Sequence, residues 1–315
     1  MRILITGANG AMAKETIKHL IHDGFTDIVM AVRTKTKGEI AKQEIMNSIE
    51  SSKNVNLSVV EGFDMNKPKE IKNAVLKLKG GRPFDIVFLA AGFAVFGDEY
   101  QSVSYNGKKI EKTIFQNLIG SHIVFSQLKK NDLVSKKARV VLAGGEGARG
   151  IKGMIEKPSF TSATDFRNYI YLNSKDLPKY NPLNAIGVSK FAGALWTKKV
   201  AELESENMEV VWFSPGLTSG SAGLKNLPFI KRTLFGVTFG IMTLFGKSQK
   251  PKQGGRKYAD CLTGKVGKNG ELIGAPVGKA IGKYTEQTPL NPLLDSAELR
   301  EELWSILQEI ELVHN

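Results

Sequence analysis

A glycine-rich turn near the N-terminus has the residue types and spacing of a phosphate-binding site. A strand-like apolar run covers residues 2–6, and the turn begins at its last residue. Residues 6–13 read Thr-Gly-Ala-Asn-Gly-Ala-Met-Ala. Glycine allows a tight turn and a close approach of the backbone to a pyrophosphate, and the free N–H groups of a following helix would stabilise its charge. We expect a dinucleotide to be bound by the residues of this turn: Gly7, Ala8, Asn9, Gly10, Ala11 and Met12.

The end of the second strand-like run indicates which dinucleotide is bound. An enzyme that uses NAD usually has an acidic residue here, which binds the ribose hydroxyls. This sequence instead has Arg33, followed by Lys35 and Lys37. Because an arginine can pair with a 2′-phosphate, the pattern predicts NADP(H) as the cofactor. The alternative is that these cations only form a solvated basic loop.

Short apolar runs that alternate with helical patterns must position this turn. The runs cover residues 2–6, 27–32, 56–61, 85–90, 139–143 and 209–213. Such alternation is typical of βαβ units, and runs without polar alternation indicate strands that are covered on both sides. We therefore predict an α/β fold, a Rossmann-type doubly wound parallel sheet with helices on both faces.

Length and composition favour one globular domain. A chain of 315 residues with 42% hydrophobic content can bury a full core, so we expect a single domain over residues 1–315. The one cysteine, Cys261, excludes an internal disulfide, and the four histidines are too dispersed to predict a metal site. The N-terminus lacks the pattern of a signal peptide, so we expect a cytoplasmic protein.

The basic character of the chain raises the question of a nucleic-acid partner. The formal net charge is +13, but the lysines are scattered along the sequence and no nucleic-acid-binding motif accompanies them. We expect them to form solvated faces and predict no nucleic-acid partner.

Two segments interrupt the alternating pattern. Residues 145–183 are rich in Gly, Pro, Asn and Ser and are expected to form an inserted loop above the sheet. Residues 220–254 contain an apolar stretch, residues 234–246, with basic residues on both sides. This stretch is too short to span a bilayer as a helix. We expect it to be a lid over an apolar small-molecule substrate of some size, the alternative being a peripheral contact with an anionic membrane surface.

Further short segments carry a resemblance to a known family. They are Phe63-Asp64-Met65, Leu89-Ala90-Ala91-Gly92, Asn117-Leu118-Ile119-Gly120 and Ser214-Pro215-Gly216-Leu217-Thr218. Through them, nearly the whole chain resembles the short-chain dehydrogenase/reductase family. The resemblance implies that Asp64 and Met65 contact the adenine, that the Ala90-Ala91-Gly92 turn lies beside the cofactor, and that Pro215, Gly216 and Thr218 line the nicotinamide.

The branch of the family is indicated by other parts of the chain. The 145–183 segment, the run at residues 29–33 and a helical pattern at residues 291–313 look most like light-dependent protochlorophyllide reductases and retinol dehydrogenases. The apolar spacing in the C-terminal pattern is typical of a core or subunit contact. Family members commonly form dimers or tetramers, so the resemblance is compatible with a homo-oligomer.

The sequence departs from the family at its catalytic residues. The resemblance implies that Asn117 is the active-site asparagine and that Lys190 is the active-site lysine, which binds the nicotinamide ribose. Ile186 stands where the family has a tyrosine, and Gly144 or a neighbour stands where it has a serine. A rival Tyr-x-x-x-Lys match at residues 171–175 is followed by Pro178 and Pro182, which prevent a long helix from continuing, so we interpret it as a decoy.

The missing tyrosine leaves the source of the proton open. Carbonyl reduction produces an alkoxide that must be protonated, and isoleucine has no proton to give. The hydride itself belongs to the cofactor. The candidate donors are Tyr171 and Tyr180, with Tyr169, Glu146 or ordered water as alternatives. We predict an NADP(H)-dependent oxidoreductase that acts on an apolar or conjugated substrate. The alternative is a catalytically inactive NADPH-binding protein, either a redox sensor or a partner subunit.

Overall fold

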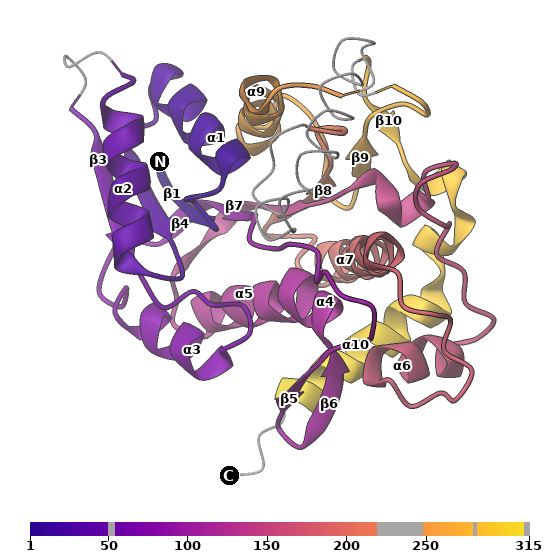
Figure 1. Cartoon of the computed structure of the whole chain (residues 1–315). Helices are drawn as coiled ribbons and strands as arrows, with labels where there is room; N and C mark the ends of the chain where they lie inside the picture. Colours follow the sequence, from indigo (N-terminus) through magenta and orange to yellow (C-terminus); the bar gives the residue numbers. More distant parts are fainter. Residues whose placement is uncertain (50–53, 219–247, 280–281, 312–315) are drawn as a thin grey trace.

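The computed structural model describes residues 1–49, 54–218, 248–279 and 282–311, and it has a Rossmann-type α/β fold. One sheet runs through the centre, with the strand order β10-β9-β8-β7-β4-β1-β2-β3 (Figure 1). Neighbouring strands are parallel except for β9 and β10. The strands are β1 Arg2–Thr6, β2 Asp27–Ala31, β3 Asn56–Val60, β4 Phe84–Leu89, β7 Val134–Ala143, β8 Glu209–Phe213, β9 Leu272–Gly274 and β10 Thr285–Glu286. The predicted fold class is confirmed.

Helices cover both faces of the sheet and enclose two separate cores (Figure 1). One face is covered by α1 Ala11–His22, α2 Lys35–Met46 and α9 Pro251–Leu262. The other face is covered by α3 Pro68–Leu76, α5 Gly120–Lys130, α7 Pro182–Leu203 and α10 Ala297–Glu311. Alternate residues of β1 serve the two cores, because Leu4 faces one and Ile3 and Ile5 face the other.

The predicted strands are confirmed to within a few residues, but β7 begins earlier and other strands were not predicted. The strands missed are the short β9 and β10 and a separate hairpin, β5 Ser102–Tyr105 with β6 Lys108–Glu111. Asn106 and Gly107 form the hairpin turn with φ values of 47° and 74°. An Asn-Gly pair is the usual sign of such a turn, so the hairpin was recognisable from the sequence.

The segment at residues 145–183 is more regular than the predicted loop. It contains a short 3-10 helix, Glu146–Arg149, and α6, Ala163–Tyr171. Ser162 caps α6, since its side chain accepts a hydrogen bond from the Asp165 N–H, and Leu172 ends the helix with a φ of 54°. Asn181 caps α7 in the same way. The polar residues that suggested a loop are therefore partly helix caps.

The expected lid lies mostly outside the described residues. This includes its whole apolar stretch, residues 234–246. The described part, residues 248–254, leads into α9 and forms its first turn. Helix α9 packs against α1, where Gly255 approaches Glu15 and Thr16 so closely that an added Cβ would lie 2.6 Å from the Glu15 Cβ.

The C-terminal helix begins later than predicted. Asn291 precedes a 3-10 turn, Pro292–Asp295, and α10 starts only at Ala297. The Asn291 side chain caps this 3-10 turn by accepting from the Leu293 N–H, and its amide donates to the Ala148 and Pro158 carbonyls. Helix α10 lies beside α6 and α7 (Figure 1). The leucines and isoleucines of α10 are buried in the core of the chain. Within the described residues, no helix is long and apolar enough to cross a membrane.

His122 lies on α5 in the core beneath α10 and is 5% exposed. Its Nδ1 accepts a 3.1 Å hydrogen bond from the Trp196 indole, so the proton of the neutral ring is on Nε2, 3.4 Å from a Glu311 oxygen. Burial lowers the pKa of His122 from 6.5 to about 4, and the charge of Glu311 opposes this shift only in part. His122 therefore has a structural role.

This burial predicts a loss of stability in acid. The unfolded chain takes up a proton near pH 6.5 and the folded chain near pH 4, so the free energy of unfolding falls as the pH falls between these values. We expect His122 to account for a loss on the order of 2 kcal/mol at about pH 4.5 relative to about pH 7. Urea unfolding of the wild type and of His122→Gln at both pH values measures this loss in the free energy of unfolding. Equal losses in the two proteins would contradict the prediction.

Candidate functional site

The glycine-rich turn connects β1 to α1 at the carboxyl edge of the sheet. Gly7 has a φ of 62°, and a Cβ at this position would lie 3.0 Å from the Ala91 Cα. The Gly10 N–H donates to the Gly7 carbonyl over 2.9 Å, and α1 begins at Ala11. The first N–H groups of α1 therefore point out of this turn, as a phosphate site requires.

A buried threonine holds this turn against the end of β4. The Thr6 hydroxyl accepts hydrogen bonds from the Ala90 N–H (2.9 Å) and the Ala91 N–H (3.0 Å), and it donates to the Phe88 carbonyl (3.3 Å). Sequence reasoning did not single out Thr6, although a threonine at the end of an apolar strand is a detectable signal. The result is that two predicted cofactor-binding segments, residues 7–12 and 90–92, lie side by side.

The predicted adenine and 2′-phosphate contacts also lie together. The Phe63 N–H donates to the Val32 carbonyl over 3.1 Å, which places Asp64 beside the exposed Arg33. The Asp64 side chain accepts from the Asn66 N–H. Met65 is buried against α5, where a Cβ at Gly120 would lie 2.7 Å from its carbonyl oxygen.

An acidic residue near these cations was overlooked. Glu61 follows β3, and its side chain accepts a hydrogen bond from the backbone N–H of Lys35, the first residue of α2. A carboxylate at a helix N-terminus is stabilised by the helix dipole. Glu61 therefore caps α2, and it follows β3 rather than β2, where an NAD enzyme usually has its acid.

Asn117 lies in a π-helical turn, Phe115–Ile119, between α4 Lys112–Ile114 and α5. Its side-chain amide donates to the Phe93 carbonyl (2.9 Å) and the Thr113 carbonyl (2.8 Å). The amide oxygen is buried and has no hydrogen-bond partner among the described residues. A Cβ at Gly92 would lie 2.3 Å from that oxygen, so only glycine fits there. A π-helical turn with a buried free acceptor is typical of a functional site.

Lys190 lies on α7 and reaches the end of β7, where its ammonium donates to the Ala143 carbonyl over 2.8 Å. Burial lowers the pKa of Lys190 to about 8. Of the two glycines that follow β7, it is Gly145 that faces this lysine, since a Cβ there would lie 3.1 Å from the Lys190 Cγ. A Cβ at Gly144 would lie 2.6 Å from the Trp212 ring, so a serine does not fit at Gly144.

The Pro-Gly turn follows β8 at the same edge of the sheet. Gly216 has a φ of 95°, and the buried Thr218 hydroxyl donates to the Gly216 carbonyl over 3.0 Å. Two residues that sequence reasoning missed hold this turn: Gln249 and Lys257 both donate to the Pro215 carbonyl. No local pattern marked them, because they come from a distant part of the chain.

The structure does not bring the candidate tyrosines to Lys190. The Tyr171 hydroxyl donates to Glu309 on α10 over 3.2 Å. The Tyr180 hydroxyl donates to the Val95 carbonyl. Burial raises the pKa of both phenols, and also that of the buried Tyr169. Each of these groups is a poorer acid than a free tyrosine, so we do not retain Tyr171 or Tyr180 as proton donors.

Comparisons with known proteins agree with this arrangement. Residues 2–99 match the KR domain family. No curated protein matches the sequence. Among solved structures, a short-chain dehydrogenase/reductase described as a glucose/ribitol dehydrogenase from Brucella melitensis has a TM-score of 0.56 and 15% sequence identity, over 90% of this chain and 97% of that chain.

Two reductases give similar values. A 3-ketoacyl-ACP reductase from Sinorhizobium meliloti 1021 has a TM-score of 0.58 and 19% identity, over 89% of this chain and 98% of that chain. The NADPH-dependent 3-quinuclidinone reductase from Rhodotorula rubra has a TM-score of 0.57 and 15% identity, over 86% of this chain and 87% of that chain. At these identities the similarity establishes the fold that this chain shares with them.

A matched pair of glycine substitutions tests the turn. Gly7→Ala and Gly24→Ala both place a side chain at positive φ, with an expected cost of about 1 kcal/mol in stability. Only at Gly7 does the new Cβ press on the Ala91 backbone, since nothing lies within 4 Å of a Cβ at Gly24. We expect Gly7→Ala alone to weaken NADPH binding, by about tenfold or more, as measured by calorimetry. An equal effect of both substitutions would contradict this assignment.

Proposed function

We propose that the protein is an NADP(H)-dependent oxidoreductase of the short-chain dehydrogenase/reductase type whose proton does not come from the usual tyrosine. The observation that carries this proposal is the convergence of Gly7, Gly92, Asn117 and Lys190 at the carboxyl edge of one parallel sheet. Ligands of open α/β sheets bind at this edge. The match of residues 2–99 to the KR domain family supports the same interpretation.

The residues present fit an NADP(H) molecule. The turn at residues 7–12 would hold the pyrophosphate, Arg33 the 2′-phosphate, and Asp64 and Met65 the adenine. Ala90, Ala91 and Gly92 would line the cofactor, and Pro215, Gly216 and Thr218 would lie along the nicotinamide. Lys190 uses one N–H on Ala143, so its remaining donors would be available to the ribose hydroxyls.

The chain's own residues must supply the proton and orient the substrate. NADPH supplies the hydride when it is bound. The lowered pKa of Lys190 makes its ammonium a better acid near neutral pH than an ordinary lysine. The free oxygen of Asn117 is suited to hold a water molecule in the same region. This supports delivery of the proton from Lys190 or from ordered water, and it suits a conjugated substrate, whose enolate-like product can be protonated later.

A catalytically inactive NADPH-binding protein, a redox sensor or a partner subunit, remains the second candidate. It is favoured by one specific observation: the two positions that would face a substrate beside Lys190 are Ile186 and Gly145, and neither carries a hydroxyl. In this case the cofactor would bind but no carbonyl would be reduced.

The choice between NADP(H) and NAD(H) depends on Arg33. Replacing it removes charge-assisted hydrogen bonds to a 2′-phosphate, so Arg33→Ala should weaken NADPH binding by about tenfold and leave NADH binding nearly unchanged. Lys136→Gln, an exposed lysine at the amino end of β7, is the control and should leave both unchanged. Calorimetric titrations with NADPH and NADH give the ratio of the two affinities. A parallel loss of both affinities in Arg33→Ala would argue against a 2′-phosphate contact.

Turnover distinguishes the two candidate functions. We expect the wild type to oxidise NADPH with conjugated enals or quinones, but to reduce simple ketones poorly. The double variant Gly145→Ser/Ile186→Tyr should gain ketone reduction of about a hundredfold, because it regains both a general acid beside Lys190 and a hydroxyl that would bind the substrate carbonyl. The matched variant Gly144→Ser/Ile186→Tyr should gain clearly less, because Trp212 leaves no room for the serine and only the tyrosine is regained.

NADPH oxidation, followed by its absorbance, distinguishes the reductase from the inactive NADPH-binding protein. Wild-type binding without turnover, together with ketone reduction by the Gly145→Ser/Ile186→Tyr variant, would support the inactive NADPH-binding protein. Failure of the wild type to bind NADPH at all would contradict both candidates.

A further inference from the structure

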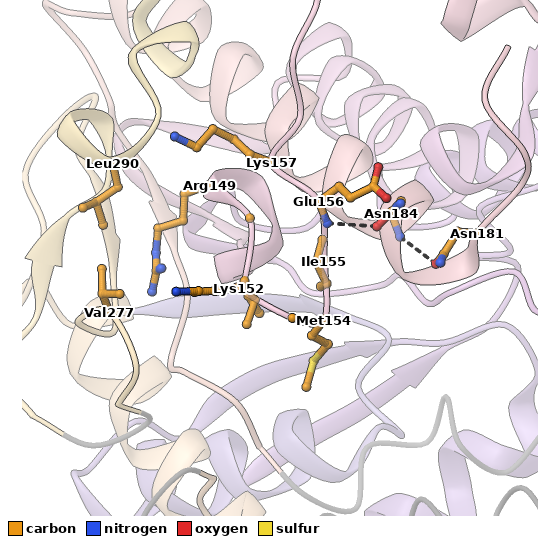
Figure 2. Close-up of a pocket in the computed structure, with 13 residues that line it drawn as sticks. Arg149, Lys152, Met154, Ile155, Glu156, Lys157, Asn181, Asn184, Val277 and Leu290 are labelled. Carbon is orange, nitrogen blue, oxygen red and sulfur yellow. Dashed lines mark hydrogen bonds between the residues drawn. The ribbon is translucent and has the colours of Figure 1, made fainter.

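A pocket with a volume of ≈ 640 Å³ is lined by residues that follow the 3-10 helix Glu146–Arg149 and by others from distant parts of the chain (Figure 2). Its wall is formed by the segment at residues 149–157, by the start of α7 and by residues that follow β9 and β10. Part of the wall is apolar, with Met154, Ile155, Val277 and Leu290. The proposed function makes no use of these residues.

The charged side chains of this pocket are mainly positive. Arg149, Lys152 and Lys157 line it, against the single acidic residue Glu156. Arg149 is held in place, since its guanidinium donates to the Gln287 side chain and to the Ala275 carbonyl. These partners are neutral. Within the described part of the chain, none of the three cations forms an ion pair with a carboxylate.

Two amides extend the set of hydrogen-bond donors. The Asn181 side-chain oxygen accepts from the Leu183 and Asn184 N–H groups, and the Asn184 side-chain oxygen accepts from the Glu156 N–H (Figure 2). Because the oxygens are occupied, the amide NH₂ groups are the donors left to a ligand. The polar lining of the pocket is therefore rich in donors.

A second pocket of equal volume shows a different arrangement. It is lined by Lys198 and Arg300 together with several acidic residues. There the cations are neutralised by the lining itself: Lys198 lies 3.0 Å from Asp295, and Arg300 lies 3.0 Å from Glu202. In the first pocket, the charge of Glu146 acts on Arg149, but none of the three cations forms such an ion pair among the described residues, so an anionic ligand would balance the remaining positive charge.

The first pocket adjoins the residues around Lys190. The 3-10 helix that carries Arg149 starts directly after Gly145, the glycine that faces Lys190. At Gly147 a Cβ would lie 3.0 Å from the Gly187 Cα and 3.2 Å from the Ile155 Cδ1, so the pocket wall packs on α7 next to Ile186. A molecule in this pocket could extend toward the proposed reaction centre.

We propose that this pocket binds the anionic group, a carboxylate or a phosphate, of a small molecule with an apolar part, and that this molecule is the substrate. Lys152 and Lys157 attract the anionic group, Arg149 and the asparagine amides orient it, and the apolar wall contacts the rest of the molecule. The substrate assignment rests on the proposed reductase function. The preference for an anion rests only on the pocket.

Three probes with the same carbon chain test the pocket: hexanoate, hexyl phosphate and the neutral hexanamide. We expect the wild type to bind at least one anionic probe about tenfold more tightly than hexanamide, as measured by calorimetry. The affinities for hexyl phosphate and hexanoate show which anionic group the pocket binds more tightly. Lys152→Gln/Lys157→Gln should remove the preference, and Lys136→Gln should retain it. Arg149 is left intact, because its hydrogen bonds also stabilise the fold.

NADPH titrations of the same samples keep the two proposals distinguishable. Normal NADPH binding with equal affinity for the three probes would overturn the pocket inference and leave the reductase standing. An anion preference without NADPH binding would overturn the reductase and the substrate role together. An anion preference that survives Lys152→Gln/Lys157→Gln would show that these lysines do not create it, and would overturn the proposed site.

Discussion

The buried hydroxyl of Thr6 joins the ends of β1 and β4 through hydrogen bonds at Phe88, Ala90 and Ala91. With this contact in place, Gly7 lies so close to the Ala91 backbone that a side chain would collide with it. Two turns from distant parts of the sequence thus form one concave edge, and α1 starts beside it. The residues proposed to bind the cofactor are arranged around this edge.

The other side of the site is built on α7. Lys190 crosses from this helix to the end of β7, and Gly145 there leaves room for it. The serine and tyrosine that the family resemblance implies are absent, and Tyr171 at the end of α6 and Tyr180 donate hydrogen bonds to other residues. The edge proposed to bind the cofactor is therefore present, but the tyrosine and serine that the family resemblance implies beside Lys190 are not. This combination suits a reductase with another proton source, and the wall of the pocket that contains Arg149, Lys152 and Lys157 packs on α7 beside the site.

Much of the fold follows from the sequence, because buried parallel strands and amphipathic helices have distinct patterns. The glycine-rich turn between β1 and α1 was predictable from local spacing, whereas Lys190 was singled out by the family resemblance, and its role stays a prediction. Lys257 and Gln249 could not be predicted, since they reach the Pro-Gly turn only through tertiary packing. The Tyr171 contact with α10 is likewise set by packing between distant segments. The apolar stretch at residues 234–246 lies outside the described residues, and its role as a lid stays a prediction.

A diffraction structure of crystals grown with NADPH tests the central claim most directly. Our account predicts the pyrophosphate at the N-terminus of α1 beside Gly7, the 2′-phosphate at Arg33, and the nicotinamide between Lys190 and the Pro-Gly turn. Density for NADPH at another place, or no density at a saturating concentration, would contradict the account.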